Sequence, residues 1–340
     1  MESKGGVKSM TLKIVIPVLI GIAVVVALFY KEFNVEALSE IKFDGRAWLC
    51  IGLAVLAVGL RDFGMAWRFH TLTDRFLQWR TSVKVTFLCE FLSAITPSSV
   101  GGSALSMFFL KKEGLNMGRA TALTFTTLFL DELFFVIIVP AVFFILPKNM
   151  LFGFDHSGGG GIKIAFWIAY GLIALWTVIL FLALIAYPHQ VKKAIVKVFQ
   201  FRLFRKWSKQ AEELAENMYQ TSLDIRHRNF AWWSRAFIAT SVSWTGRYLV
   251  VNALFWGFFP EAPQLLVFCR QVVVWALLMF SPTPGGSGLS EWLFKEYYGD
   301  LISGAGALMV LALIWRFLSY YIYLIIGIFL LPSFFKKKTK

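Results

Sequence analysis

Gly101-Gly102-Ser103-Ala104-Leu105-Ser106 and Gly285-Gly286-Ser287-Gly288-Leu289-Ser290 are two copies of one short motif, and each lies inside a long apolar stretch. The copies are 184 residues apart, and a Thr-Pro step precedes each, at Thr96-Pro97 and at Thr283-Pro284. Proline lacks the amide proton that a helix needs, so the sequence predicts that both apolar segments are broken here. Paired broken segments in the two halves of a membrane protein are typical of a transporter's binding site. The alternative is that the small residues only let membrane helices pack closely.

The composition places the chain in a membrane. Its 340 residues are 58% apolar and 17% aromatic, with only 16% charged, which is more apolar than soluble domains. Six stretches reach about 20 residues, the length that crosses a bilayer, and they lie near residues 12–30, 47–69, 119–146, 162–187, 232–259 and 302–332. Two further apolar regions, 83–110 and 264–298, are split by the motif into halves mostly too short to span. We therefore predict an all-α polytopic membrane protein with about six spanning helices and two re-entrant helical hairpins.

Positive charge is concentrated in the connections between the apolar stretches. The net charge is +14, with basic residues in the C-terminal tail and in the connection 188–231, where apolar residues also recur at helical spacing. Such charge sets the orientation of membrane helices and attracts anionic lipid, which explains it more simply than nucleic acid does. We expect a multi-pass protein of a prokaryotic cytoplasmic membrane, with both termini in the cytoplasm. The connection then forms an amphipathic helix that lies on the membrane surface or packs on the protein.

This orientation makes the two halves of the chain inverted relative to each other. The unit 47–146 is a helix, the hairpin 83–110 and a helix, and it starts outside the cell. The unit 232–332 has the same order around the hairpin 264–298 and starts inside. The hairpin tips then meet near the bilayer centre, which is the architecture of alternating-access transporters. We predict one membrane domain over residues 1–340, with the possibility of a homo-oligomer.

Nine ionisable residues lie well inside the apolar segments: Arg61, Asp62, Glu90, Asp131, Glu132, Arg247, Arg270, Glu291 and Arg316. Each costs about 2.5–3.5 kcal/mol near a helix centre, so the nine must face one another or water. Glu132 and Arg316 are 184 residues apart, and each lies near mid-depth of its segment. We predict that these two side chains pair across the interface of the repeats. The alternative for any one pair is an ion pair that only fixes helix register.

The glycine tips complete a candidate site. A short helix that starts at Ser103 or Ser287 exposes unpaired backbone N–H groups and the positive end of its dipole, which suits a phosphate. Glu291 lies one turn beyond Ser287 and can cap that helix, neutralise Arg316 or Arg270, or carry a proton. The predicted substrate-binding residues are Gly101, Gly102, Ser103, Gly285, Gly286, Ser287, Arg61, Arg247 and Arg316. The predicted charge network or coupling residues are Asp62, Asp131, Glu132, Arg270 and Glu291.

No catalytic or metal-binding motif is readable in the sequence. Cys50, Cys89 and Cys269 stand singly in apolar segments, so neither a disulfide nor a metal site is expected. The four histidines are isolated near segment ends, without the spacing of a zinc hydrolase. We expect no cofactor, no metal and no catalytic residue.

Several of these motifs resemble a known family. Their residues are Thr96 to Ser103, Lys111-Lys112-Glu113-Gly114, Asp131-Glu132, Thr283 to Gly288, Glu291 and Arg316, and together they resemble the flippase-like membrane region of lysylphosphatidylglycerol synthases. The resemblance implies movement of an aminoacylated phospholipid between leaflets, while a separate soluble domain attaches the amino acid. We expect no such domain here, because 340 residues leave no room for it. Some relatives carry an acidic residue and an arginine where this chain has Ser103 and Ser106, so the preferred headgroup can differ.

The sequence favours a flippase that moves a lipid with a charged headgroup between leaflets. The headgroup would sit between the tips while the acyl chains stay in the bilayer. A secondary transporter of a small soluble anion would share this architecture, and lipid-stimulated transport would distinguish the two. A membrane-embedded transferase acting on a lipid-linked substrate, with Glu291 or Asp131 as base, is disfavoured by the lack of a metal or nucleotide motif. A non-catalytic scaffold is the remaining alternative.

Overall fold

The computed structural model describes residues 41, 43–96, 102, 105–152, 159–200, 205–302 and 304–335, and within these ranges the fold is entirely helical. Most elements are α-helices, η1 and η3 are single π-helical turns, and η2 is a 3₁₀ turn. The elements are α3 (Gly45–Leu72), α4 (Trp79–Ile95), α6 (Ser106–Lys112), α7 (Met117–Ile145), α8 (Lys148–Phe152), α9 (Gly159–Phe181), η1 (Leu182–Ala186), α10 (Pro188–Gln200), η2 (Arg205–Trp207), α11 (Ser208–Arg226), α12 (Phe230–Phe258), α13 (Gln264–Leu278), α14 (Leu289–Tyr298), α15 (Ala305–Arg316), η3 (Phe317–Tyr321) and α16 (Ile322–Phe335).

Four helical stretches of the described chain are long and apolar enough to cross a membrane. They are Gly45–Leu72, Met117–Ile145, Gly160–Ala186 and Gly306–Leu331, and each lies within a few residues of a predicted span. Helix α12 covers the predicted span 232–259 and is as long as α7, although it is less apolar. The predicted span 12–30 lies outside the described residues. The chain is thus a membrane protein with several apolar helices, and the total of six spans stays a prediction.

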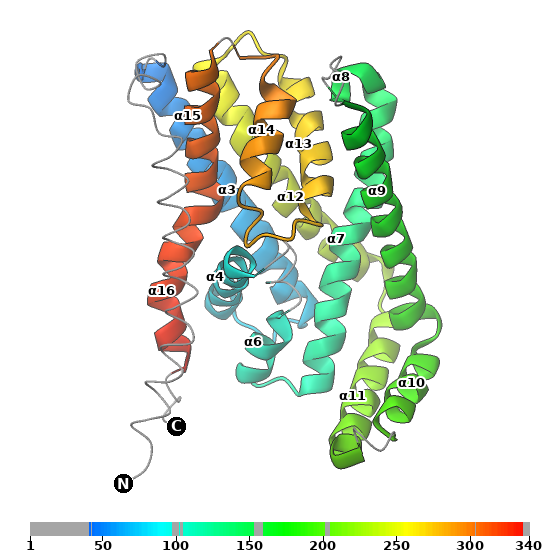
Figure 1. Cartoon of the computed structure of the whole chain (residues 1–340). Coiled ribbons are helices and arrows are strands. Elements are labelled where there is room, and N and C mark those ends of the chain that lie inside the picture. The colour runs from blue at the N-terminus through cyan, green and yellow to red at the C-terminus, as the bar shows by residue number, and fades with distance from the viewer. Residues whose placement is uncertain are drawn as a thin grey trace.

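Both regions expected to form hairpins are interrupted near the predicted points. Helix α4 ends at Ile95, and Thr96 is extended (φ −98°, ψ 148°), the conformation favoured before a proline. Helices α13 and α14 are separated by residues 279–288, which we call the second tip. There Gly285, Gly286 and Gly288 have positive φ, which glycine adopts without steric cost. Figure 1 shows α4 and α6 in one half of the molecule and α13 and α14 in the other.

The two interrupted regions contact each other where their helices end. The backbone N–H of Gly285 donates a 3.3 Å hydrogen bond to the carbonyl of Thr96. The Tyr320 hydroxyl, from η3, donates to the Ala94 carbonyl at 3.0 Å. The first bond joins the second tip to the end of α4 and the second joins η3 to it, so segments far apart in sequence meet inside the bundle (Figure 1).

Glycines let α3 and α12 pack with their backbones in near contact. A Cβ on Gly64 would lie 2.5 Å from the Ser243 nitrogen, and a Cβ on Gly246 would lie 2.6 Å from the Arg61 nitrogen. The two helices run antiparallel, because moving toward the start of α3, from Gly64 to Arg61, moves the contact toward the end of α12, from Ser243 to Gly246. This close pair of helices forms the centre of the bundle on which the other elements pack.

The connection between the halves packs on the protein. Helix α11 buries Ala211, Ala215 and Met218, and a Cβ on Gly118 of α7 would meet the Leu214 carbonyl at 2.7 Å. The sequence left two positions open for the amphipathic connection 188–231, on the membrane surface or against the protein. Helix α11 packs against the protein. The three cysteines are buried and free, as predicted.

We expect Gly64→Ala to destabilise the protein by about 1–3 kcal/mol, because the added methyl group would overlap the α12 backbone. The matched control is Gly171→Ala in α9, where nothing lies within 4 Å of the added carbon and alanine favours the helix. Thermal unfolding in detergent should show a lower midpoint for the first variant only. Equal midpoints for both variants would contradict the packing described for α3 and α12.

Candidate functional site

Glu90 lies between two arginines in the interior of the bundle. It forms an ion pair with Arg61 of α3, and it accepts a 3.0 Å hydrogen bond from Nη2 of Arg247 of α12. The Arg61 side chain is 1% exposed, that of Glu90 is 8% exposed and that of Arg247 is 14% exposed. A single carboxylate from α4 is thus shared by guanidinium groups from the two central helices.

Aromatic rings and a second carboxylate surround this triad. The Arg61 guanidinium lies 4.5 Å from the ring centroid of Tyr323, whose hydroxyl is 2.7 Å and 2.8 Å from the two oxygens of Asp62. Arg247 lies over Trp275 at 4.6 Å. Such contacts stabilise cations where water is scarce. We call Arg61, Asp62, Glu90, Arg247 and Tyr323 the central cluster.

Arg316 holds the second tip in place. Its Nε lies 2.8 Å from Oε1 of Glu291, its Nη1 donates to the Gly285 carbonyl at 3.1 Å, and its Nη2 donates to the Ser287 hydroxyl at 3.2 Å. Glu291 also accepts the backbone N–H of Gly288 at 2.7 Å. Two of the roles left open for Glu291, helix capping and neutralisation of Arg316, are therefore both found.

The helix that follows the second tip is not an open anion site. It begins at Leu289 rather than at Ser287, and the Glu291 carboxylate occupies its capping position. In the first region α6 begins only at Ser106. At the second tip the Gly288 N–H is thus already paired with a carboxylate of the same helix, and the Ser290 N–H donates to the Gly286 carbonyl. A phosphate site built from unpaired N–H groups there stays a prediction that would require Glu291 to move away.

Of the first motif copy, Gly101 and Ser103 lie outside the described residues, and Gly102 is described. The Gly102 N–H donates to the Ser93 hydroxyl at 3.1 Å, and a Cβ here would overlap the Cys89 carbonyl of α4. Gly102 is therefore required for close packing on α4. In the second copy Gly286 is also packed tightly, since a Cβ would lie 3.3 Å from Leu278.

The central cluster and the second tip enclose only a small space between them. A cavity of about 30 Å³ is lined by residues of both, Arg247 and Gly285 among them, and also by Arg316. This volume suits about one water molecule. No headgroup fits in this cavity as it stands, so a headgroup bound there would require the second tip to move away from the central cluster.

Asp131 forms a second interior ion pair, with Arg68, that was not predicted from the sequence. Nη1 of Arg68 lies 2.5 Å from Oδ1 of Asp131, and the indole N–H of Trp244 donates to the same oxygen at 2.8 Å. Arg68 is two helical turns after Arg61, so both face the bundle interior from α3. The seven-residue spacing between Arg61 and Arg68 was the sequence signal that could have predicted a second interior arginine. Arg68 lies at the end of its apolar stretch, so it was not counted among the residues inside the stretch.

Glu132 does not pair with Arg316, which corrects the sequence-based prediction. Arg316 binds Glu291, and Figure 1 shows α7 and α15 on opposite sides of α13 and α14. Glu132 instead lines an apolar pocket of about 460 Å³, together with Leu172, Ile173, Leu175, Trp176, Ile179, Met279, Phe280 and Ser281. Its residue is 5% exposed, and its Oε2 has no hydrogen-bond partner.

Arg270 is separate from the central cluster. It forms a bidentate ion pair with Asp300 at 2.5 Å and 2.7 Å, and it donates to the carbonyls of Tyr297 and Met150 at 2.6 Å and 2.8 Å. These bonds tie α13 to the end of α14 and to α8. The prediction that Arg270 shares one network with the other charges is therefore wrong, because its partners lie in α8, in α14 and directly after α14.

Removal of the Glu90 carboxylate should destabilise the fold strongly. We expect Glu90→Ala to lower stability by about 3–5 kcal/mol, because it leaves two buried guanidinium groups without their shared partner. Glu261→Ala, at an exposed carboxylate after α12, is the control and should have little effect. Denaturation in detergent measures both, and similar stabilities would refute the importance given to the triad.

Glu132 should respond to neutralisation in the opposite way. Since Oε2 of Glu132 is buried without a hydrogen-bond partner and no cation pairs with this carboxylate among the described residues, Glu132→Gln should leave the melting temperature equal or higher. Glu90→Gln should lower it. A drop of similar size in both variants would indicate that Glu132 has a partner after all.

Comparison with known proteins shows the family to which the chain belongs. A family model described as "Lysylphosphatidylglycerol synthase TM region" matches residues 14–327. The "UPF0104 membrane protein" of Archaeoglobus fulgidus is 23% identical over 327 residues, which is 92% of this chain and 94% of the relative. An "Uncharacterized protein MG306" of Mycoplasma genitalium is 23% identical over 214 residues, 61% of this chain and 53% of the relative. No solved structure matches. The chain belongs to the family of lysylphosphatidylglycerol synthase membrane regions.

Proposed function

We propose that this protein moves a lipid with a phosphate-bearing headgroup between the two leaflets, without a chemical step. The observation that carries the proposal is the meeting of two interrupted apolar segments beside buried arginines. A bilayer-spanning protein gains nothing in stability from so many interior charges, since each costs several kcal/mol. Such residues mark substrate pathways in membrane proteins.

Hydrogen bonds hold the second tip and η3 against the end of α4, which suits a gate. They are the Gly285 to Thr96 backbone bond and the Tyr320 to Ala94 bond. Tyr320 belongs to η3, a π-helical turn directly after Arg316, and such turns are common at functional sites. In our proposal the tips part when a headgroup enters, and η3 moves with the second tip.

The headgroup phosphate would exchange partners with Glu90. Arg247 and Arg316 both line the small cavity, and Arg247 is more exposed than Arg61. A phosphate that replaces Glu90 at Arg247 leaves Glu90 paired with Arg61. The exchange keeps every interior charge compensated, so the barrier to movement stays low. Arg61 is then a positioning residue rather than a direct contact.

The pocket at Glu132 gives a route from the bilayer. Its α9 wall consists of apolar side chains that include the exposed Leu172, Leu175, Trp176 and Ile179. Its inner wall includes Ser281 of the second tip. Acyl chains can remain among the α9 side chains while the headgroup moves inward. Glu132, which no cation occupies, is placed to bind the amine of a zwitterionic or aminoacylated headgroup.

The packing of α3 and α12 supports the predicted inverted repeat and its re-entrant hairpins. The two helices run antiparallel, and Gly246 contacts the backbone at Arg61, so Arg61 and its proposed equivalent Arg247 lie close together at the crossing. A two-fold axis in the membrane plane through this crossing would relate the halves. In this arrangement each hairpin enters from one face and both termini lie in the cytoplasm, on the side of the basic α10 and α11.

A leaflet-exposure assay tests the proposal. Vesicles with the full chain should move a fluorescent phospholipid faster than empty vesicles, and Arg247→Gln should reduce the rate at least tenfold. Arg226→Gln, at an exposed arginine of α11, is the matched control and should transport normally. Equal rates for native, Arg247→Gln and empty vesicles would refute lipid transport. Efflux of a trapped soluble anion without lipid movement would instead favour an anion transporter.

A further inference from the structure

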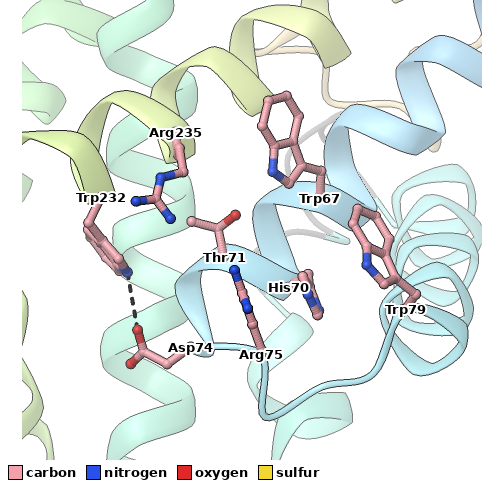
Figure 2. A pocket seen from close by; sticks show the side chains of 8 residues that line it. All are labelled: Trp67, His70, Thr71, Asp74, Arg75, Trp79, Trp232 and Arg235. Atoms are coloured by element: carbon pink, nitrogen blue, oxygen red, sulfur yellow. Dashed lines mark hydrogen bonds between the residues drawn. The ribbon is translucent and has the colours of Figure 1, made fainter.

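A second cationic site lies at the end of α3, away from the central cluster. Its pocket of about 550 Å³ is lined by Trp67, His70, Thr71, Asp74, Arg75, Trp79, Trp232 and Arg235, and we call it the tryptophan pocket. His70 is nine residues beyond Arg61 on the same helix, a rise of about 14 Å. Figure 2 shows Arg75 and Arg235 directed into the space between α3 and α12. Neither residue belongs to the transport pathway described above.

The backbone at this pocket adopts an unfavourable conformation. Asp74 and Arg75 have φ values of 54° and 63°, and they are the non-glycine residues with positive φ in the described part of the chain. Two adjacent residues of this kind are costly and persist where surrounding contacts hold them. Asp74 is held by Arg228 at 2.5 Å, by Arg119 at 3.6 Å and by the Trp232 indole at 3.3 Å. These contacts fix the turn that aims Arg75 into the pocket.

The pocket has uncompensated positive charge. Its carboxylate, Asp74, is already bound by Arg119 and Arg228. Within the described residues no ion pair or hydrogen bond is recorded for the guanidinium groups of Arg75 and Arg235. Two guanidinium groups that converge without a carboxylate repel each other unless an anion binds between them. Planar guanidinium groups match the oxygens of a phosphate in particular.

Aromatic side chains connect the pocket to the apolar surface of α3. Trp79 stacks on His70 at 4.7 Å and on Phe63 at 5.7 Å between ring centroids. Phe63 is 50% exposed and Trp79 is 42% exposed, so this ladder faces outward beside the bundle. Tryptophan is favoured where headgroups meet acyl chains. A ligand with a phosphate and an attached apolar chain fits this combination better than a free phosphate does.

We propose that the tryptophan pocket binds the headgroup phosphate of an anionic phospholipid in one leaflet, with Arg75 and Arg235 on the phosphate and an acyl chain along Trp79 and Phe63. The site is independent of transport through the central cluster. It holds its lipid at the membrane interface whether or not the tips separate.

Native mass spectrometry of the full chain in neutral detergent can test this site. Phosphatidylglycerol, phosphatidylcholine and inorganic phosphate are titrated separately. We expect retention of phosphatidylglycerol, with at least a tenfold loss of affinity in the double variant Arg75→Gln/Arg235→Gln. Arg80→Gln, an exposed arginine outside the pocket lining, should bind as the native chain does. Arg247→Gln should also keep this lipid, which separates the site from the transport proposal.

Further arms of the experiment identify the ligand. Trp79→Ala should weaken phosphatidylglycerol binding and leave phosphate binding unchanged. Phosphate bound as tightly as the lipid, with no effect of Trp79→Ala, would overturn the lipid assignment. Unchanged lipid affinity in the double variant would overturn the site itself. If that variant does not fold, the double variant Arg75→Lys/Arg235→Lys, which keeps both charges, takes its place. Lipid binding to this second variant that does not weaken when salt is added would equally overturn the proposal.

Discussion

The ion-paired triad of Arg61, Glu90 and Arg247 is the constraint on which the centre of this bundle depends. Each charge would be costly alone in a membrane interior, so the three side chains must remain together. They come from α3, α4 and α12, and their contact fixes where α4 lies against the central pair of helices. The glycines at the crossing serve the same end, because they let the two arginines approach one carboxylate. The end of α4, and with it the contact at Thr96, is positioned by this triad.

The sequence predicted the helices and their interruptions well because those depend on local chemistry. Proline and glycine around Thr96 and Gly285 determine where helices stop, and apolar length determines which can span. Which charged side chains pair depends on the distances between packed helices, and these distances cannot be predicted from the periodicity of the sequence. Equivalent positions in a repeat are related by an axis, yet they touch only near that axis. Arg61 and Arg247 lie close together where α3 and α12 cross, whereas Glu132 and Arg316 lie on opposite sides of α13 and α14.

The acids of the interior separate into two physical classes. Glu90, Asp131 and Glu291 each bind an arginine and so contribute to structure. Glu132 binds none in the described part of the chain and lines an apolar pocket. Sequence alone placed Asp131 and Glu132 together as neighbours, but successive residues on a helix point about 100° apart and reach different surroundings. An unpaired buried carboxylate lowers the stability of the fold. Packing does not explain why such a residue is kept, whereas a role in ligand binding does.

The two cationic sites differ in how their charge is balanced, and this difference follows from depth. At the end of α3 the guanidinium groups of Arg75 and Arg235 bind no carboxylate of the described residues, which is tolerable where water and headgroups can solvate them. In the interior Arg61, Arg247 and Arg316 are all compensated. An interior site with free positive charge would be unstable when empty and would release an anion slowly when full. In the exchange proposed at Glu90 the phosphate would leave behind paired arginines, which avoids both difficulties, whereas the pocket at the end of α3 would hold its lipid without taking part in that exchange.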